Sequence, residues 1–194
     1  MSWFKNSTVI SGLLLAAAPW VLAVSAVRAD VGHPSSSVSS GSQQLNTFSS
    51  EDLKAFAAAR VGMADAIATA QKYSRGWVVE ARFEVTTDTS VYKVRTHAGE
   101  AIWEGEIDAV SGQVTGAGKR IPVNELDEEA RSELSGVVRV PTASLLQAVT
   151  LAENRVSGKV ISAEVEEING ENAYELILFK DGLLHRLIYR SRYH

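Results

Sequence analysis

The chain has 194 residues, of which 45% are hydrophobic, 22% charged and 7% aromatic, and this composition excludes a collagen, a coiled coil or a wholly disordered chain. Its 19 basic and 23 acidic side chains give a formal net charge of −4, which argues against a nucleic-acid-binding protein. No cysteine is present, so disulfides, zinc–thiolate sites, thiol catalysis and lipidation on cysteine are excluded.

Residues 1–29 are typical of a secretory signal peptide. Lys5 precedes an uncharged run over 9–26, and the small residue Ala29 offers a cleavage site before Asp30. An uncleaved membrane anchor is the alternative, because a run of this length is just sufficient to span a bilayer. Pro19 interrupts the run and favours cleavage. We therefore expect a periplasmic or secreted protein with no stable membrane span after signal removal.

Residues 30–50 are expected to form a flexible leader. The segment 33–50 contains eight serines and few apolar residues, so it offers little surface that folding could bury. Regular structure is expected to begin at Ser49 or Ser50, which can cap a helix that has Glu51 and Asp52 in its first turn.

The pattern of apolar residues then predicts two groups of helices and strands. In the first group we expect helices over 51–61 and 63–72, interrupted at Gly62, followed by strands over 79–85, 91–96 and 101–109. Residues 116–122 are expected to form a connector, and a helix should follow from Asn124 or Asp127 to Leu134, closed by Gly136. In the second group we expect a helix from about Thr142 to Gly158 and strands over 160–168, 173–179 and 183–190, with hairpin turns at 169–170 and 181–182.

The two groups repeat each other at a constant spacing, here called the repeat interval and defined as the separation of Ala66 from Ala148. Seven identical pairs follow this interval without a gap: Ala66/Ala148, Ala70/Ala152, Gly76/Gly158, Val78/Val160, Ala81/Ala163, Glu84/Glu166 and Tyr92/Tyr174. Beyond Tyr92 the match decays. The alanines leave no bulk on one helix face, so each helix can approach a sheet closely.

These observations predict an α+β fold of two tandem repeats, each with helices packed on an antiparallel β-meander. The expected domains are a first repeat over 51–118, a connector with a short helix over 119–141 and a second repeat over 142–194.

The repeated pattern resembles the PepSY family. The first repeat carries Ala66, Ile67 and Ala70 on a helix, Tyr92 on a strand, and the turn Asp108-Ala109-Val110-Ser111-Gly112. The second carries Ala148, Val149, Ala152 and Tyr174, but Ile188-Tyr189-Arg190-Ser191 stands where the Asp-Ala-x-Ser-Gly turn should be. The resemblance covers roughly 60–116 and 142–191. It implies a non-catalytic domain of the kind found in propeptides of secreted thermolysin-like metallopeptidases and in cell-envelope proteins.

No catalytic, cofactor or metal site is predicted from the residues. His33, His97, His185 and His194 lack metal-ligand spacing. The acidic groups at 164–171 and 125–129 could be imagined as a carboxylate pair, but alternating strand acids and acids in a first helical turn usually face solvent or cap the helix. Asp108 is expected to accept backbone N–H groups in an Asx-type turn, with Gly112 at positive φ.

Trp77 and Trp103 are the candidate partner-binding residues, since neither has an aromatic counterpart in the second repeat. Ordinary packing is the alternative for both. Tyr92 and Tyr174, at equivalent positions, are expected to pack with their hydroxyls at the rim of the core.

Three function hypotheses follow. The first is a non-enzymatic exported regulator that inhibits or modulates a peptidase through protein–protein contact. The second is a binding or sensor module for a small ligand or envelope component, held in a groove between the repeats. The third is an enzyme, which would need an acid–base pair that the sequence does not reveal. The target, the binding surface and the oligomeric state are left open.

Overall fold

The computed structural model of the chain describes residues 36–39, 48–87, 89–137, 144–168 and 171–190, all within one compact unit, His33–His194. The signal peptide expected at 1–29 lies outside the described residues, as do most of the leader, the hairpin turn at 169–170 and the helix start near Thr142. Among the described residues, no helix is long and apolar enough to cross a membrane.

Antiparallel pairing joins seven long strands and one short strand of the described residues into a sheet with the order β1-β8-β7-β6-β2-β3-β4-β5. The strands on one side of the β2–β6 junction are β2 (Trp77–Val85), β3 (Ser90–Ala98), β4 (Ala101–Asp108) and β5 (Val114–Pro122). Those on the other side are β6 (Lys159–Ile168), β7 (Glu171–Lys180), β8 (Leu183–Arg190) and β1 (Ser36–Ser39).

Side-chain caps start two of the helices, and residues in the left-handed conformation end two of them. They are α2 (Ser50–Ala58), α3 (Met63–Ser74), the short 3-10 turn η2 (Val123–Glu125), α4 (Glu128–Val137) and α5 (Leu145–Val156). Capping boxes at Ser49 and Ser144 start α2 and α5, and residues in the left-handed conformation, Arg75 and Ser157, end α3 and α5. α4 continues one residue past Gly136.

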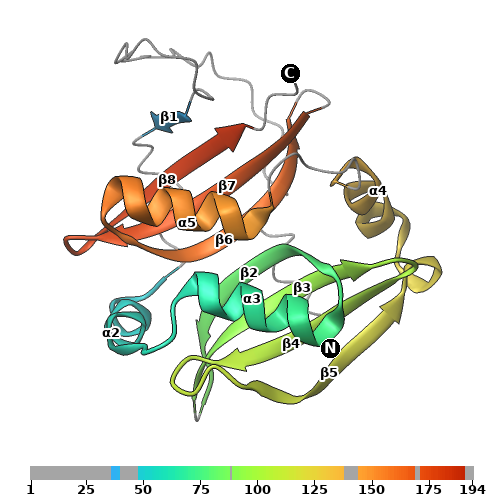
Figure 1. Ribbon diagram of the computed structural model, residues 1–194, viewed down its shortest axis with the longest axis horizontal. Helices are drawn as coiled ribbons and strands as arrows, with labels where there is room; N and C mark the ends of the chain where they lie inside the picture. The colour runs from blue at the N-terminus through green and yellow to red at the C-terminus, as the bar shows by residue number, and fades with distance from the viewer. Residues whose placement is uncertain (1–35, 40–47, 88, 138–143, 169–170, 191–194) are drawn as a thin grey trace. The chain divides into compact units, whose positions relative to one another are not determined.

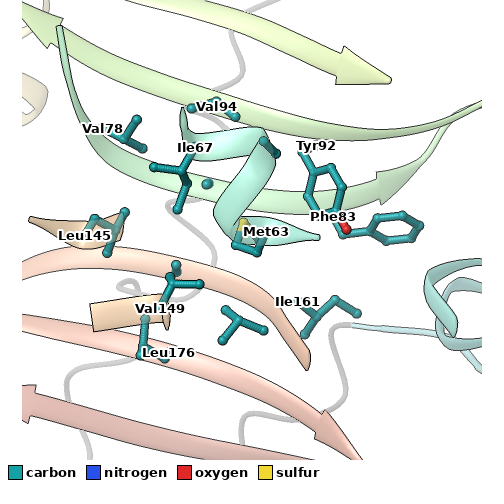
Figure 2. Packing of buried hydrophobic residues seen from close by; sticks show 14 of the residues in the cluster. Met63, Ile67, Val78, Phe83, Tyr92, Val94, Leu145, Val149, Ile161 and Leu176 are labelled. Atoms are coloured by element: carbon teal, nitrogen blue, oxygen red, sulfur yellow. The ribbon is translucent and has the colours of Figure 1, made fainter. Parts of the chain in front are cut away.

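α3 packs on β2, β3 and β4, and α5 packs on β6 and β7 (Figure 1). One apolar cluster includes buried residues of both helices and of both sets of strands (Figure 2). The helices can approach the strands because their inner faces carry the alanines of the repeated pattern, while bulkier residues such as Ile67 and Val149 fill the remaining space. The expected α+β architecture, with helices on an antiparallel sheet, is confirmed.

The segment from α3 to β4, here called the first half, and the segment from α5 to β8, the second half, have matching geometry. The bounds of α3 and α5 are separated by the repeat interval at both ends. Register shifts occur between Val78 and Glu80 in β2 and between Val160 and Ser162 in β6, which is the same place in each half. β2 and β6 pair with Ala81 directly opposite Ala163.

Residues 116–122, expected to be a connector, belong instead to strand β5, which pairs with β4. The prediction was wrong because Gly116 and Gly118 break the alternation that identifies a strand. Both glycines have positive φ, near +70° and +67°, and the pairing of β5 with β4 shifts register between Glu104 and Glu106. The strand is therefore bulged, and its large apolar residues, Val114 and Ile121, stand near its ends.

The Ser-rich leader also differs from expectation over its described part. Ser36–Ser39 form β1, which pairs with Arg186–Tyr189 of β8. A composition with few apolar residues does not exclude strand pairing, because the edge of β8 offers backbone hydrogen-bonding groups to an extended segment.

Candidate interaction surface

The residues of the repeated motif lie in the core. Those on α3 and α5 are buried against the sheet: Ala66, Ile67, Ala70, Ala148, Val149 and Ala152. Tyr92 and Tyr174 are also buried. The Tyr92 hydroxyl donates to the Val61 carbonyl at 2.6 Å, and burial, followed by repulsion from Glu153 and Asp65, raises its pKa well above the usual range. These motif positions therefore lie within the buried core of the fold.

Asp108 closes the turn between β4 and β5. Its Oδ1 accepts from the backbone N–H of Ser111 at 2.6 Å, from that of Val110 at 3.1 Å and from the Ser111 hydroxyl at 2.8 Å. The hydrogen bonds from Ser111 lower the pKa of Asp108. Gly112 has a φ of +73°. The Asx-type turn expected here is present, and it aims no oxygen ligands at a shared point.

Trp103 is packed inside the protein, with 4% of its surface exposed. Its indole N–H donates to the Ala117 carbonyl at 3.2 Å, and its ring lies 5.4 Å from that of Tyr73, centroid to centroid. The ring also covers Gly105 so closely that a Cβ atom there would stand 2.1 Å from the indole. A partner could reach this tryptophan only after the local packing opened.

Trp77 is half-buried at the start of β2. Its Nε1–H donates to Nδ1 of His97 at 2.9 Å, and the two rings meet edge to face. This hydrogen bond assigns the proton of neutral His97 to Nε2. Burial lowers the pKa of His97, which keeps the imidazole neutral and able to accept. Part of the Trp77 ring remains available at the surface.

Charged side chains on β2, β3 and β4 point away from α3. Arg95 lies between two carboxylates, 3.2 Å from Glu80 and 3.4 Å from Glu104, and Lys93 lies 2.5 Å from Glu84. Glu104 is only 7% exposed, and its pKa is raised by burial, partly offset by Arg95. Sequence reasoning missed this ladder, although the alternation of charged and apolar residues along β2 and β3 could have indicated it.

The acids of β6 and β7 extend this charged face across the β2–β6 junction. Glu164 faces Glu80 directly, and Arg186 pairs with Glu175. Desolvation of the Glu164 carboxyl by the atoms around it, with repulsion from Glu80, Glu166 and Glu175, raises the pKa of Glu164 to about 8. The Glu164 side chain itself is exposed, so solvent weakens this repulsion. The cluster is therefore an excess of negative charge that the protein tolerates at its surface.

The second acidic group of the sequence, residues 125–129, includes a helix cap. Asp127 caps α4 by accepting from the backbone N–H of Ala130 at 2.8 Å, as expected for an acid at a helix start. Within the described part of the chain, no three His, Asp or Glu side chains are placed to hold a metal ion. Backbone edges are further surface features of the described residues: β5 ends the sheet on one side, and on the other side the short strand β1 pairs with four residues of β8.

Comparison with known proteins gives one family match. Residues 60–117 match the PepSY family, described as peptidase propeptide and YPEB domain, so this segment, from α3 to the start of β5, carries a PepSY domain. The crystal structure of a candidate lipoprotein from Clostridium difficile 630 is similar with 20% identity and a TM-score of 0.41, over 69% of this chain and 88% of that chain. No curated protein matches the chain.

Proposed function

We propose that this chain is a non-enzymatic, exported regulator that inhibits a peptidase through protein–protein contact. The observation that carries the proposal is the match of residues 60–117 to a family described by peptidase propeptides. The burial of the motif residues supports it, because buried side chains are poorly placed to act on a substrate.

Residues 142–191 are proposed to be a second, diverged PepSY-like unit. Three features support this part of the proposal: the common spacing of α3 and α5, the equivalent register shifts in β2 and β6, and the burial of Tyr92 and Tyr174 at equivalent positions. The unit has lost the Asp-containing turn, because Tyr189 and Arg190 stand at the positions of Ile107 and Asp108.

Export is proposed from the sequence of residues 1–29, which has the charge, apolar run and exit of a cleavable signal. Cell fractionation followed by N-terminal sequencing tests it. We expect an envelope or secreted protein that begins at Asp30, whereas a cytoplasmic chain that retains Met1 would contradict export.

The regulatory function is tested by titration against a thermolysin-like metallopeptidase, with hydrolysis of a small peptide substrate as the readout. We expect dose-dependent inhibition by the intact chain and loss of inhibition after the chain is unfolded. Full activity at saturating protein, or rapid digestion of the chain, would contradict an inhibitor of this class of peptidase.

Crosslinked capture from the envelope fraction, with the mature chain as bait, extends the test to peptidases of other classes. Excess untagged chain should compete away any specific enrichment. An enriched peptidase must then be inhibited in the titration. Enrichment of other envelope proteins alone would favour the binding-module alternative.

The alternative of a ligand groove between the repeats finds no supporting feature where it was expected. β2 pairs with β6 across that boundary, and side chains of α3 and α5 belong to the same buried cluster (Figure 2).

A further inference from the structure

We propose that the outer edge of β8 is an acceptor site for an extended segment of a partner protein, and that β1 occupies this site in cis until the partner replaces it. The inference rests on the proposed function, because it names the surface by which a protein partner would be held.

β1 lies beside β8 in the second half at the position that β5 occupies beside β4 in the first half. β5 pairs with β4 through Glu104, Glu106 and Ile107. β1 pairs with β8 through Arg186, Ile188 and Tyr189, which stand one repeat interval after those positions. Both added strands run antiparallel to their neighbour. The edge of β8 can therefore pair with one more strand, and in this chain that strand is β1, which comes from the leader and is distant from β8 in the sequence.

β8 is longer than the described strand that pairs with it. β1 pairs with four residues of β8, which extends from Leu183 to Arg190. Leu183, at the end of β8 beyond this pairing, is 63% exposed and is among the largest exposed apolar side chains of the described residues. An acceptor edge with an exposed apolar end is suited to a longer strand than β1.

The register defines the sequence that would fit better. Alternate residues of β8 share one face, and Leu187 on that face is buried opposite Val38. In the same register, positions 40 and 42 of the incoming strand fall opposite His185 and Leu183. The leader sequence has serines at both positions. The partner segment should therefore carry apolar residues at three alternate positions.

The opposite edge of the sheet is a poorer acceptor. β5 contains Gly116 and Gly118 at positive φ and then the exposed bases Lys119 and Arg120. Bulges and exposed bases are devices that keep an edge strand from pairing with another chain. Leu183 and Leu184, at the end of β8 beyond its pairing with β1, carry neither device, although Arg190 at the other end of the strand is an exposed base.

The leader can reach β8 within the same chain. Phe48 lies against Arg82 of β2, with the guanidinium carbon 4.9 Å from the ring centroid. β2 and β8 are separated by three strand spacings, about 14 Å, and the chain from Ser39 to Phe48 can span about 30 Å. Such a short tether holds β1 at an effective concentration in the millimolar range, so a weak strand can occupy the edge and still be displaced.

The absence of cysteine permits a clean test in the full chain. Ser37→Cys with Ile188→Cys joins two residues that face each other across β1 and β8, so oxidation should lock the leader and reduction should free it. Val38→Pro should release β1, because proline removes a backbone donor and fits a paired strand poorly. Gln44→Pro, outside β1, is the matched control.

The probe is a fluorescein-labelled peptide of residues 32–43 that carries Ser40→Val and Ser42→Leu, and the unaltered peptide is its control. Fluorescence anisotropy should show binding to the Val38→Pro chain at least about tenfold tighter than to the wild type or the Gln44→Pro chain, because the cis competitor is lost. The oxidised double-cysteine chain should bind no peptide, and reduction should restore wild-type binding. The unaltered peptide should bind more weakly throughout.

Equal binding to the locked and released chains, or no binding to the released chain, would overturn the proposal. Concentration-dependent dimers of the Val38→Pro chain that exclude the peptide would also overturn it, since a second copy would then be the occupant. These measurements use no peptidase. If the locked and the reduced chains inhibited a peptidase equally well, the proposed function would stand, but the edge of β8 would not be the surface that contacts the peptidase.

Discussion

The close approach of Trp103 to Gly105 allows a quantitative test of the core. A Cβ atom at Gly105 would stand 2.1 Å from Cζ2 of the indole, far inside van der Waals contact. Gly105 does not have positive φ, so alanine meets no backbone strain there. Any loss of stability in Gly105→Ala should therefore come from the collision with the indole.

The expected loss has a lower and an upper bound. If neighbouring atoms shift and the indole stays buried, overpacking costs about 1–3 kcal/mol of the free energy of unfolding. The lower backbone entropy of the unfolded alanine chain offsets about 0.4–1 kcal/mol of that loss. If the indole is expelled, the burial of its roughly 150–250 Å² is lost, which corresponds to about 4–6 kcal/mol. With the entropy offset included, we expect a net loss of about 1–2 kcal/mol.

A double-mutant cycle isolates the contact. Urea unfolding followed by circular dichroism should be measured for Gly105→Ala in the wild-type chain and in a Trp103→Leu background. In the second background the collision partner is gone, so alanine should be neutral or slightly stabilising. The coupling between the two substitutions should therefore exceed about 1 kcal/mol.

Two results would refute this reasoning. Equal destabilisation by Gly105→Ala in both backgrounds would place the cause in the backbone. No destabilisation in the wild-type background would mean that the indole does not rest on Gly105. Gly99→Ala is a useful contrast, because no atom lies within 4 Å of its Cβ position and only its φ of +64° opposes the substitution.

Three further predictions follow from the polar contacts. Asp108→Ala should lower the free energy of unfolding by about 1 kcal/mol at neutral pH, because three accepted hydrogen bonds are lost. Since the hydrogen bonds from Ser111 lower the folded-state pKa of Asp108, the difference from wild type should shrink as the pH falls through that lowered pKa. Urea titrations that show no difference at pH 7 would contradict the role of the turn. Glu164→Gln should stabilise the protein by up to about 1 kcal/mol at pH 9 and leave its stability unchanged at pH 4. The reason is that a carboxyl group with a raised folded-state pKa destabilises the fold increasingly as the pH rises from its unfolded-state pKa to about 8. Thermal unfolding at the two pH values checks this prediction, and destabilisation at pH 9 would contradict it. Tyr92→Phe should cost about 1–2 kcal/mol in urea unfolding, because it leaves the carbonyl before α3 without its donor, and an unchanged midpoint would show that water replaces the hydroxyl.

The sequence allowed most of the helices and long strands to be predicted because their signals are local. Strict alternation identified β2, and an apolar stripe at helical spacing identified α3. Asp181-Gly182 marked the turn between β7 and β8, where both residues have positive φ. Such signals depend on neighbours in sequence and need no knowledge of the tertiary fold.

β5 and β1 could not be predicted because their signals are not local. β5 lacks alternation, and β1 is a serine-rich segment that pairs with β8, a strand far from it in the sequence. Packing of Trp103 was one of the two expectations for this residue, but the groups that it packs against could not be predicted for a similar reason. A glycine within a strand, at Gly105, is a sign that another group approaches the backbone closely, but only the fold identifies that group.

The pairing of Ala81 with Ala163 gives the β2–β6 junction the geometry of a two-fold interface within one chain. A sheet made from two copies of the first half would place an arginine opposite a glutamate on both sides of this axis. In this chain Glu80 lies instead opposite Glu164, and Arg82 lies opposite Ser162. Because the two sides of the axis belong to different segments of one chain, each side can carry its own residues, whereas a symmetric dimer would repeat any like-charge pair on both sides.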